Sequence, residues 1–188
     1  MVSTAAGATG AMVVQIAKHI LKIPRVVGIT SSSQKMAMIK GLGCDIALNY
    51  KSPTFEADLA VATSRGIDLY FDHVGGYMLD MMLKRMNVRG RVVACGSIGS
   101  YTNDNTAEAA YTRELRRIIM SGVKIQGFNV GHYAPDFPNG QKELGGWIKE
   151  GKIKVLTTIF ETAFEGVPEG MDKLFRGENE GKLVTKIK

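Results

Sequence analysis

The stretch Ala5-Ala6-Gly7-Ala8-Thr9-Gly10 lies close to the start of the chain, and an amphipathic segment with helical spacing follows it directly. Such a turn joins the first strand of a dinucleotide-binding unit to its first helix, where small residues let the backbone approach a pyrophosphate and the helix N-terminus supplies amide donors. We therefore predict that Gly7, Ala8, Thr9 and Gly10 form a pyrophosphate-binding turn. Because only four residues precede the turn, we expect the chain to open partway along a central strand.

Strand-like and helix-like segments alternate along the chain in the order that gives parallel βαβ units. The predicted strands are Val2–Thr4, Arg25–Thr30, Cys44–Asn49, Ile67–Asp72, Arg91–Cys95, Lys124–Val130, Val155–Phe160 and Leu183–Ile187. The predicted helices cover residues 12–21, 36–42, 55–63, 79–86, 109–120, 141–149 and 168–175. The pattern predicts an α/β fold, a Rossmann-like doubly wound parallel sheet with helices on both faces. We expect a main domain of residues 1–152 and a C-terminal strand–helix–strand segment of residues 153–188.

The residues after the second predicted strand indicate which dinucleotide is bound. An NAD-binding unit places Asp or Glu about 20 residues beyond its first glycine, where the carboxylate holds the ribose 2′-hydroxyl. No acid occurs between Val26 and Lys35; Thr30, three serines and Lys35 stand there instead. Hydroxyls and a cation suit a 2′-phosphate dianion, so we predict NADPH as the cofactor. The alternative is that Lys35 is a solvated lysine at the start of a helix.

Composition limits the other classes of function. The chain has 188 residues and a formal net charge of +6, but its Lys and Arg residues are scattered and no aromatic residues interleave with a basic cluster. We therefore do not expect nucleic acid as the main partner, nor a membrane span, since no apolar run reaches about 18 residues. We expect a cytoplasmic protein; a mitochondrial or peroxisomal location stays open.

Metal and disulfide chemistry are not expected either. The two cysteines, Cys44 and Cys95, are far apart and each lies in an apolar, strand-like context that favours packed, reduced thiols. His19 and His132 have no partner at metal-ligand spacing. We predict no metal site.

Motifs along essentially the whole chain resemble those of a known family. These motifs are AAGATG (5–10), VVGITSSSQK (26–35), LGCDIALNYK (42–51), GIDLYFDHVGG (66–76), GRVVACGSIGSY (90–101), IQGFNVGHY (125–133) and GENEGKLV (177–184). They resemble the cofactor-binding half of the zinc-free medium-chain dehydrogenase/reductase superfamily, in the branch of prostaglandin reductases, alkenal double-bond reductases and quinone-oxidoreductase-like proteins. The resemblance implies that an N-terminal GroES-like catalytic domain is lacking here, and that residues 153–188 would return to that domain.

The resemblance also implies roles for individual residues. Ala8, Thr9 and Gly10 would bind the pyrophosphate, and Ser32, Lys35 and Tyr50 the 2′-phosphate. Cys95, Gly96 and Ile98 would follow the adenosine and ribose, Phe128 and Val130 would lie beside the nicotinamide, and Asn179 would touch the cofactor near its reactive end. Tyr101 matches a tyrosine that approaches the substrate carbonyl, which makes it the candidate catalytic residue. His73 stands where the branch often has Asn, and its imidazole can still donate one hydrogen bond, which would allow contact with the cofactor.

The implied reaction is hydride transfer from NADPH to the β-carbon of an α,β-unsaturated carbonyl, with an enone or quinone as substrate. We expect these 188 residues alone to bind NADPH but to catalyse poorly. Family members commonly pair edge strands, so we expect a homodimer through Lys124–Val130. Two alternatives remain: a non-catalytic NADPH-binding scaffold, and an RNA-binding relative of the quinone reductases.

Overall fold

The computed structural model describes residues 1–100 and 112–188, and it divides into two compact units. The first unit comprises Met1–Ser3 and Pro53–Gly140, and the second comprises Thr4–Ser52 and Gln141–Lys188. Each unit is therefore assembled from segments far apart in the sequence. The expected division into residues 1–152 and 153–188 stays a prediction.

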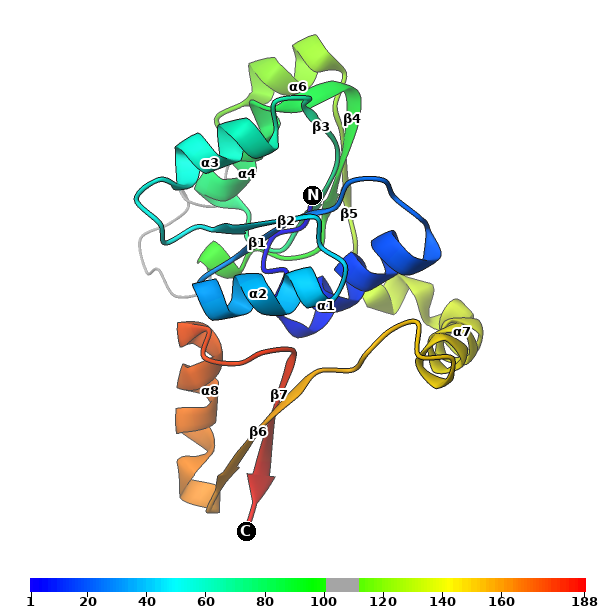
Figure 1. The fold of residues 1–188 in the computed structure, drawn as a ribbon, viewed down its shortest axis with the longest axis vertical. Coiled ribbons are helices and arrows are strands. Elements are labelled where there is room, and N and C mark those ends of the chain that lie inside the picture. Colours follow the sequence, from blue (N-terminus) through cyan, green and yellow to red (C-terminus); the bar gives the residue numbers. More distant parts are fainter. Residues whose placement is uncertain (101–111) are drawn as a thin grey trace. The chain divides into compact units, whose positions relative to one another are not determined.

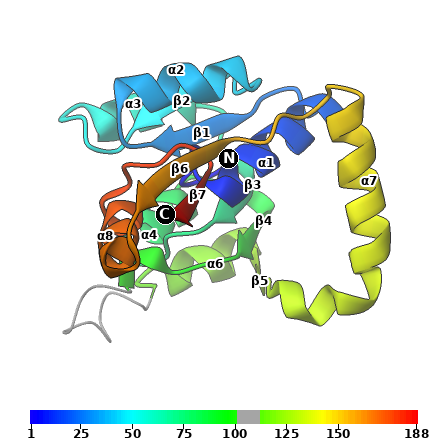
Figure 2. The ribbon, with the colours of Figure 1, turned by 90° about the horizontal axis from the view of Figure 1, so that it is seen from below.

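The N-terminal part of the second unit is a parallel strand pair with helices. Helix α1 (Ala8–Gln15) runs on into a π-helical turn, η1 (Ile16–Ile20), and is followed by β1 (Val27–Thr30), α2 (Ser33–Gly41) and β2 (Ile46–Asn49). All four residues of β1 are buried, as expected for a parallel strand covered on both faces. Helix α2 packs along β1 and β2 (Figure 2). Gly28 permits this packing, since a Cβ there would lie 2.8 Å from Ile39 Cδ1.

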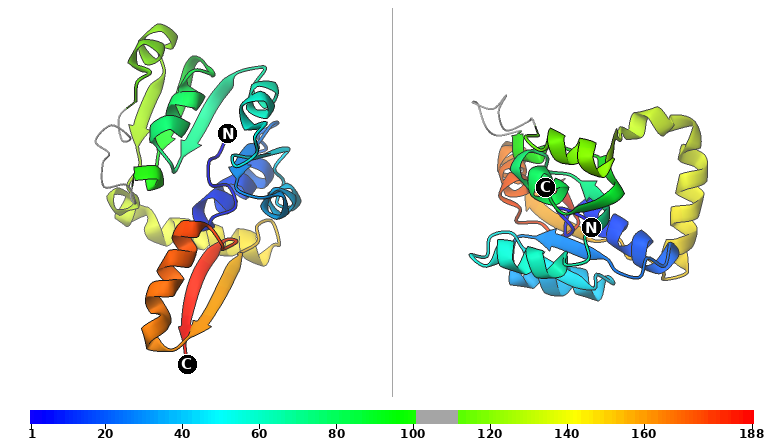
Figure 3. Two further views of the ribbon diagram at one scale, coloured as in Figure 1. Left: turned by 90° about the vertical axis from the view of Figure 1, so that its left-hand side faces the viewer. Right: turned by 90° about the horizontal axis from the view of Figure 1, so that it is seen from above.

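The C-terminal part of the second unit is a parallel strand–helix–strand. Strand β6 (Thr157–Thr162) is connected to β7 (Lys182–Ile187) through a short 3-10 turn, η4 (Phe164–Gly166), and helix α8 (Val167–Arg176). Helix α8 runs alongside the two strands (Figure 3). Burial alternates along β6, so one face of this strand pair is covered and the other is exposed. Helix α7 (Phe137–Lys149) precedes this segment in the chain.

The first unit is built on a parallel sheet in the order β3-β4-β5 (Figure 1). Its elements in chain order are α3 (Phe55–Ala62), β3 (Ile67–Asp72), α4 (Gly76–Leu83), β4 (Met86–Ala94), η2 (Ile98–Ser100), α6 (Leu115–Ser121), β5 (Lys124–Gly127) and η3 (Val130–Asp136). Tyr70, Met82, Leu83 and Val92 are fully buried in its core. The N-terminal residues join this sheet, because Val2 pairs in parallel with Phe71.

The predicted parallel α/β class is confirmed, while several boundaries are wrong. The helix predicted over 79–86 ends at Leu83, and Met86 instead opens β4 by pairing with Ile67. The edge strand predicted over Lys124–Val130 ends at Gly127, because the Asn129 side chain accepts a hydrogen bond from the Gly131 amide at 2.9 Å and caps a 3-10 turn. A side chain that hydrogen-bonds to a nearby backbone amide in this way competes with the hydrogen bonds of the sheet and ends the strand.

Candidate functional site

The glycine turn of the second unit forms an open helix start. Helix α1 begins at Ala8 with Gly7 as its N-cap, no side chain caps it, and its first turn holds no acid. Its first amides therefore have no intrahelical acceptor and are available to an anion. Gly10 lets the helix pack on the preceding turn, since a Cβ there would lie only 2.3 Å from the Thr4 carbonyl oxygen. The turn is therefore closely packed at Gly10, while its binding of a pyrophosphate stays a prediction.

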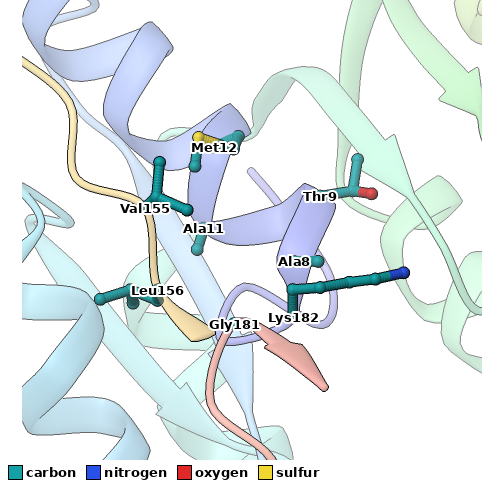
Figure 4. Close-up of a pocket in the computed structure, with 8 residues that line it drawn as sticks. All are labelled: Ala8, Thr9, Ala11, Met12, Val155, Leu156, Gly181 and Lys182. Carbon is teal, nitrogen blue, oxygen red and sulfur yellow. The ribbon is translucent and has the colours of Figure 1, made fainter. Parts of the chain in front are cut away.

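A cavity of about 350 Å³ opens beside this turn (Figure 4). Ala8, Thr9 and Met12 line it from α1, and Val155 and Lys182 line it from the C-terminal segment of the same unit. Figure 4 shows the Lys182 side chain extending along the start of α1, past Ala8. The start of α1 therefore faces the cavity, and Lys182 is a cation among the residues that line it.

The predicted 2′-phosphate residues lie together at the carboxyl ends of β1 and β2. Ser32 caps α2 by accepting a hydrogen bond from the Lys35 amide at 3.2 Å. Tyr50 is 46% exposed, and its amide donates to the carbonyl oxygen of Thr30, the last residue of β1, at 2.9 Å. The Lys35 ammonium donates to the Gly177 carbonyl oxygen at 2.5 Å. Burial lowers the pKa of Lys35, which indicates an ammonium that has lost part of its hydration.

Asn179 lies in the loop between α8 and β7. Its side chain is 7% exposed, and its amide donates to the Gly181 carbonyl oxygen at 2.7 Å. The Gly181 amide in turn donates to the Ala6 carbonyl oxygen at 2.8 Å, and Gly181 pairs in parallel with Gly7. Asn179 therefore shapes the loop that lies next to the glycine turn.

In the first unit, a buried carboxylate fixes the turn that carries His73. Asp72 is 1% exposed, and its Oδ1 accepts hydrogen bonds from the Val74 amide at 3.0 Å and from the Tyr70 hydroxyl at 2.9 Å. Gly75 then takes a positive φ of 70°, which favours glycine, and precedes α4. Asp72 was not among the predicted site residues, although an acid that ends an apolar strand before Gly75-Gly76 is a usable signal.

Among the described residues, one ring nitrogen of His73 has a hydrogen-bond partner and the other has none. Its Nδ1 lies 2.9 Å from the Ser3 carbonyl oxygen. Because a carbonyl oxygen only accepts, Nδ1 carries the proton and Nε2 presents a lone pair. Nε2 is buried and has no partner among the described residues. Burial lowers the pKa of His73, so the neutral imidazole is favoured. Nε2 is therefore a hydrogen-bond acceptor, not the donor that was expected, because the Ser3 carbonyl oxygen already takes the ring proton.

The other predicted residues of the first unit follow the carboxyl ends of β4 and β5. The Cys95 amide donates to the Asp72 carbonyl oxygen at 2.8 Å, and the Ile98 amide to that of His73 at 3.1 Å. A Cβ at Gly96 would approach the His73 carbonyl oxygen to 3.1 Å. These three residues therefore lie against the His73 turn.

The aromatic residues of the first unit extend this edge. The Phe71 ring lies 5.1 Å from the His73 ring and 6.5 Å from that of Phe128. Phe128 also contacts Tyr133, with 5.2 Å between centroids, while Val130 is 59% exposed. Apart from Tyr101, which lies outside the described residues, the structure thus gathers the predicted residues of this unit along one sheet edge, where open α/β folds bind ligands.

The structure gives no sign of a metal centre or membrane helix in the part of the chain that it describes. No group of His, Cys, Asp and Glu side chains among residues 1–100 and 112–188 could hold a metal ion. Burial raises the pKa of the Cys44 thiol to about 11, which makes it a packing residue. No helix within the same ranges is long and apolar enough to cross a membrane.

Parallel βαβ units with a glycine turn at an open helix start define a Rossmann-like α/β protein. Residues 8–144 match the family described as zinc-binding dehydrogenase, and the chain belongs to this family. The resemblance inferred from the motifs is therefore confirmed.

Curated relatives and solved structures extend this result. The chain is 40% identical to the putative NADP-dependent oxidoreductase YfmJ of Bacillus subtilis (strain 168), over 100% of this chain and 55% of that protein. It is 36% identical to prostaglandin reductase 1 of Mus musculus, over 99% of this chain and 56% of that one. The crystal structure of CurA in complex with NADPH from Vibrio vulnificus matches with a TM-score of 0.90 and 30% identity, over 100% of this chain and 56% of that chain. The chain spans about half the length of these proteins.

Proposed function

We propose that this chain binds NADPH. The observation that carries the proposal is the second unit's combination of an uncapped helix start at the glycine turn with Ser32 and Lys35, which follow β1 with no acid between them. Phosphate oxygens accept hydrogen bonds, so they match amides, a hydroxyl and an ammonium. The match to a CurA structure solved with NADPH supports the same cofactor.

Each unit holds proposed binding residues of its own. Those for the pyrophosphate and the 2′-phosphate lie in the second unit, together with Asn179: Gly7, Ala8, Thr9, Gly10, Ser32, Lys35 and Tyr50. Those for the adenosine, ribose and nicotinamide lie in the first unit: His73, Cys95, Gly96, Ile98, Phe128 and Val130. The Nε2 of His73, which has no partner in the described part of the chain, fits a hydroxyl or amide donor of the dinucleotide and does not fit a phosphate oxygen, which only accepts.

For the whole protein we propose reduction of the C=C bond of α,β-unsaturated carbonyls, of the 15-keto prostaglandin, alkenal or quinone type. Bound NADPH supplies the hydride for the β-carbon. Tyr101 is the proposed donor to the carbonyl oxygen, where negative charge builds up. Relatives named prostaglandin reductase 1 support this substrate class. The chain spans about half of those relatives, so the activity is assigned to the whole protein and the cofactor binding to this chain.

We further propose that the protein forms a homodimer through β5 and works in the cytoplasm. Strand β5 pairs with β4 alone among the described strands, and each of its residues is exposed. An unpaired strand edge is a template for a second copy. Light scattering should report a dimer, which Ile125→Lys should convert to a monomer. Val61→Lys, at an exposed position on α3, is the control and should leave the dimer intact.

Calorimetric titration with NADPH and then with NADH tests the cofactor proposal. The chain should bind NADPH at least about tenfold more tightly, a difference of about 1.4 kcal/mol. Lys35→Ala should weaken NADPH binding and leave NADH binding nearly unchanged. Lys40→Ala, in the last turn of the same helix, is the matched control. Equal losses for both cofactors in Lys35→Ala, or binding of neither by the unaltered chain, would contradict the proposal.

A further inference from the structure

The loop Gly177–Lys182 is attached to the first turn of α2 by side-chain hydrogen bonds within the second unit. Lys35 Nζ donates to the Gly177 carbonyl oxygen, and Gln34 Nε2 donates to Glu180 Oε1 at 3.0 Å. The Glu180 backbone is fixed as well, because its amide donates to Thr158 Oγ1 at 3.0 Å and its carbonyl accepts from the same hydroxyl at 2.8 Å. The Glu180 carboxylate is therefore held beside the start of α2.

This carboxylate lies where a helix attracts an anion. The first turn of α2 contains no acid of its own, and the partial positive charge of a helix N-terminus stabilises negative groups placed there. Glu180 also acts on the neighbouring cation: burial is the largest effect and lowers the pKa of Lys35, while the charge of Glu180 raises it. The Glu180 carboxylate thus adds a negative charge close to the residues that would bind a 2′-phosphate.

A second cation, Lys51, belongs to the same charge environment. It follows Tyr50 in the turn after β2, its amide donates to Asn49 Oδ1 at 3.0 Å, and its Nζ lies 5.9 Å from the Tyr50 ring centroid. The charge of Lys51 also reaches Lys35, whose pKa it lowers. Within the described part of the chain, the Lys51 ammonium forms no ion pair. It is therefore free to meet an anion next to Tyr50.

We infer that Glu180 opposes the cofactor's 2′-phosphate while Lys51 attracts it, so that these two residues set how strongly the chain prefers NADPH to NADH. The inference rests on the proposed function. Lys35, Lys51 and Glu180 together carry one net positive charge, whereas a phosphate monoester carries about −1.5 to −2 at neutral pH. With the phosphate bound, the three side chains and the phosphate together carry a net negative charge. Glu180 is the acidic residue among the three, so neutralising Glu180 would reduce that negative charge.

Charge-neutral variants with matched controls test this balance by calorimetric titration. Glu180→Gln keeps an oxygen that can accept from Gln34, and it should tighten NADPH binding about two- to fivefold, the range of a partly exposed charge pair. Glu178→Gln is the control, because this neighbouring carboxylate pairs with Arg176 at 2.6 Å and Lys173 at 3.4 Å instead. Lys51→Gln should weaken NADPH binding by a similar factor, and Lys40→Gln should change nothing. NADH affinity should stay constant throughout.

The outcomes separate this inference from the proposed function. If the unaltered chain prefers NADPH but Glu180→Gln behaves like Glu178→Gln, or changes NADH affinity equally, the inference is wrong and the proposed function stands. If the unaltered chain binds neither cofactor, both fail. A thermal melt of each variant checks folding, and higher salt should shrink the gain in Glu180→Gln, because ions screen exposed charges.

Discussion

His73 Nδ1 lies 2.9 Å from the Ser3 carbonyl oxygen, while its Nε2 is buried without a partner among the described residues. The Ser3 hydroxyl also accepts a hydrogen bond from the His73 amide at 2.8 Å, so both the backbone and the ring of His73 are held by one residue. This arrangement fixes the tautomer and leaves one ring nitrogen as an acceptor.

The buried imidazole predicts a loss of stability in mild acid. Burial lowers the pKa of His73 below the usual 6.5, so the unfolded chain takes up this proton at a higher pH than the folded chain. The contribution of His73 is therefore complete above about pH 6.5 and declines as the pH falls through the lowered, folded value. Denaturant titrations between pH 7.5 and about pH 5 measure the decline before most carboxylates titrate.

His73→Asn should remove this part of the pH dependence, because an amide can donate to the Ser3 carbonyl oxygen but does not titrate. His132→Asn is the control, since His132 is an exposed histidine outside the His73 turn. An unchanged slope in His73→Asn would show that another group titrates in this range.

Gly10 should not tolerate a side chain. Its added Cβ would meet the Thr4 carbonyl oxygen at 2.3 Å and the Ala5 Cα at 2.9 Å, and both neighbours are backbone atoms. We expect Gly10→Ala to cost about 1–3 kcal/mol of unfolding free energy, as other overpacking substitutions do. Gly41→Ala is the opposite case on α2, with nothing within 4 Å of the new Cβ, and should stabilise by about 0.5–1 kcal/mol. Urea denaturation of both variants checks the pair.

The sequence predicted the parts of the fold that local pattern controls. Strand β1 lies within the apolar, β-branched run Arg25–Thr30, and β2 lies within the predicted strand Cys44–Asn49. The glycine turn was likewise evident from its small residues. These features depend on contacts between close neighbours in the chain.

Features that depend on distant contacts were not predictable. Glu180 reaches Gln34 across 146 residues, and Ser3 reaches the His73 ring across 70. The helix predicted over 79–86 ends at Leu83 for the same reason, because Met86 pairs with Ile67 across the sheet. The periodicity of apolar residues does not show with which strand these residues pair in the fold.

Asp72 should be essential for the stability of the first unit. Asp72→Ala would leave the buried Tyr70 hydroxyl and the Val74 amide without their acceptor. An unsatisfied buried donor costs about 1–3 kcal/mol, and Asp72→Asn should recover much of the loss because it keeps Oδ1. Chemical denaturation of the two variants measures the difference. Asp68→Ala, at an exposed position that accepts a hydrogen bond from Asn87, is the control and should change stability little.

Gln15 should hold the segment before β6 to helix α1. It is 2% exposed and makes a reciprocal pair with the backbone of Lys154: its Nε2 donates to the carbonyl oxygen at 3.0 Å, and its Oε1 accepts from the amide at 2.7 Å. Gln15→Leu fills similar space but leaves the Lys154 carbonyl and amide without their hydrogen-bond partner. We therefore expect a loss of about 1–3 kcal/mol in the free energy of unfolding. Hydrogen exchange should locate the effect: the Lys154 amide should exchange faster in Gln15→Leu, while the amides of β3 keep their protection. Unchanged exchange at Lys154 would mean that the packing of Ile153, 2% exposed, holds this segment without the glutamine.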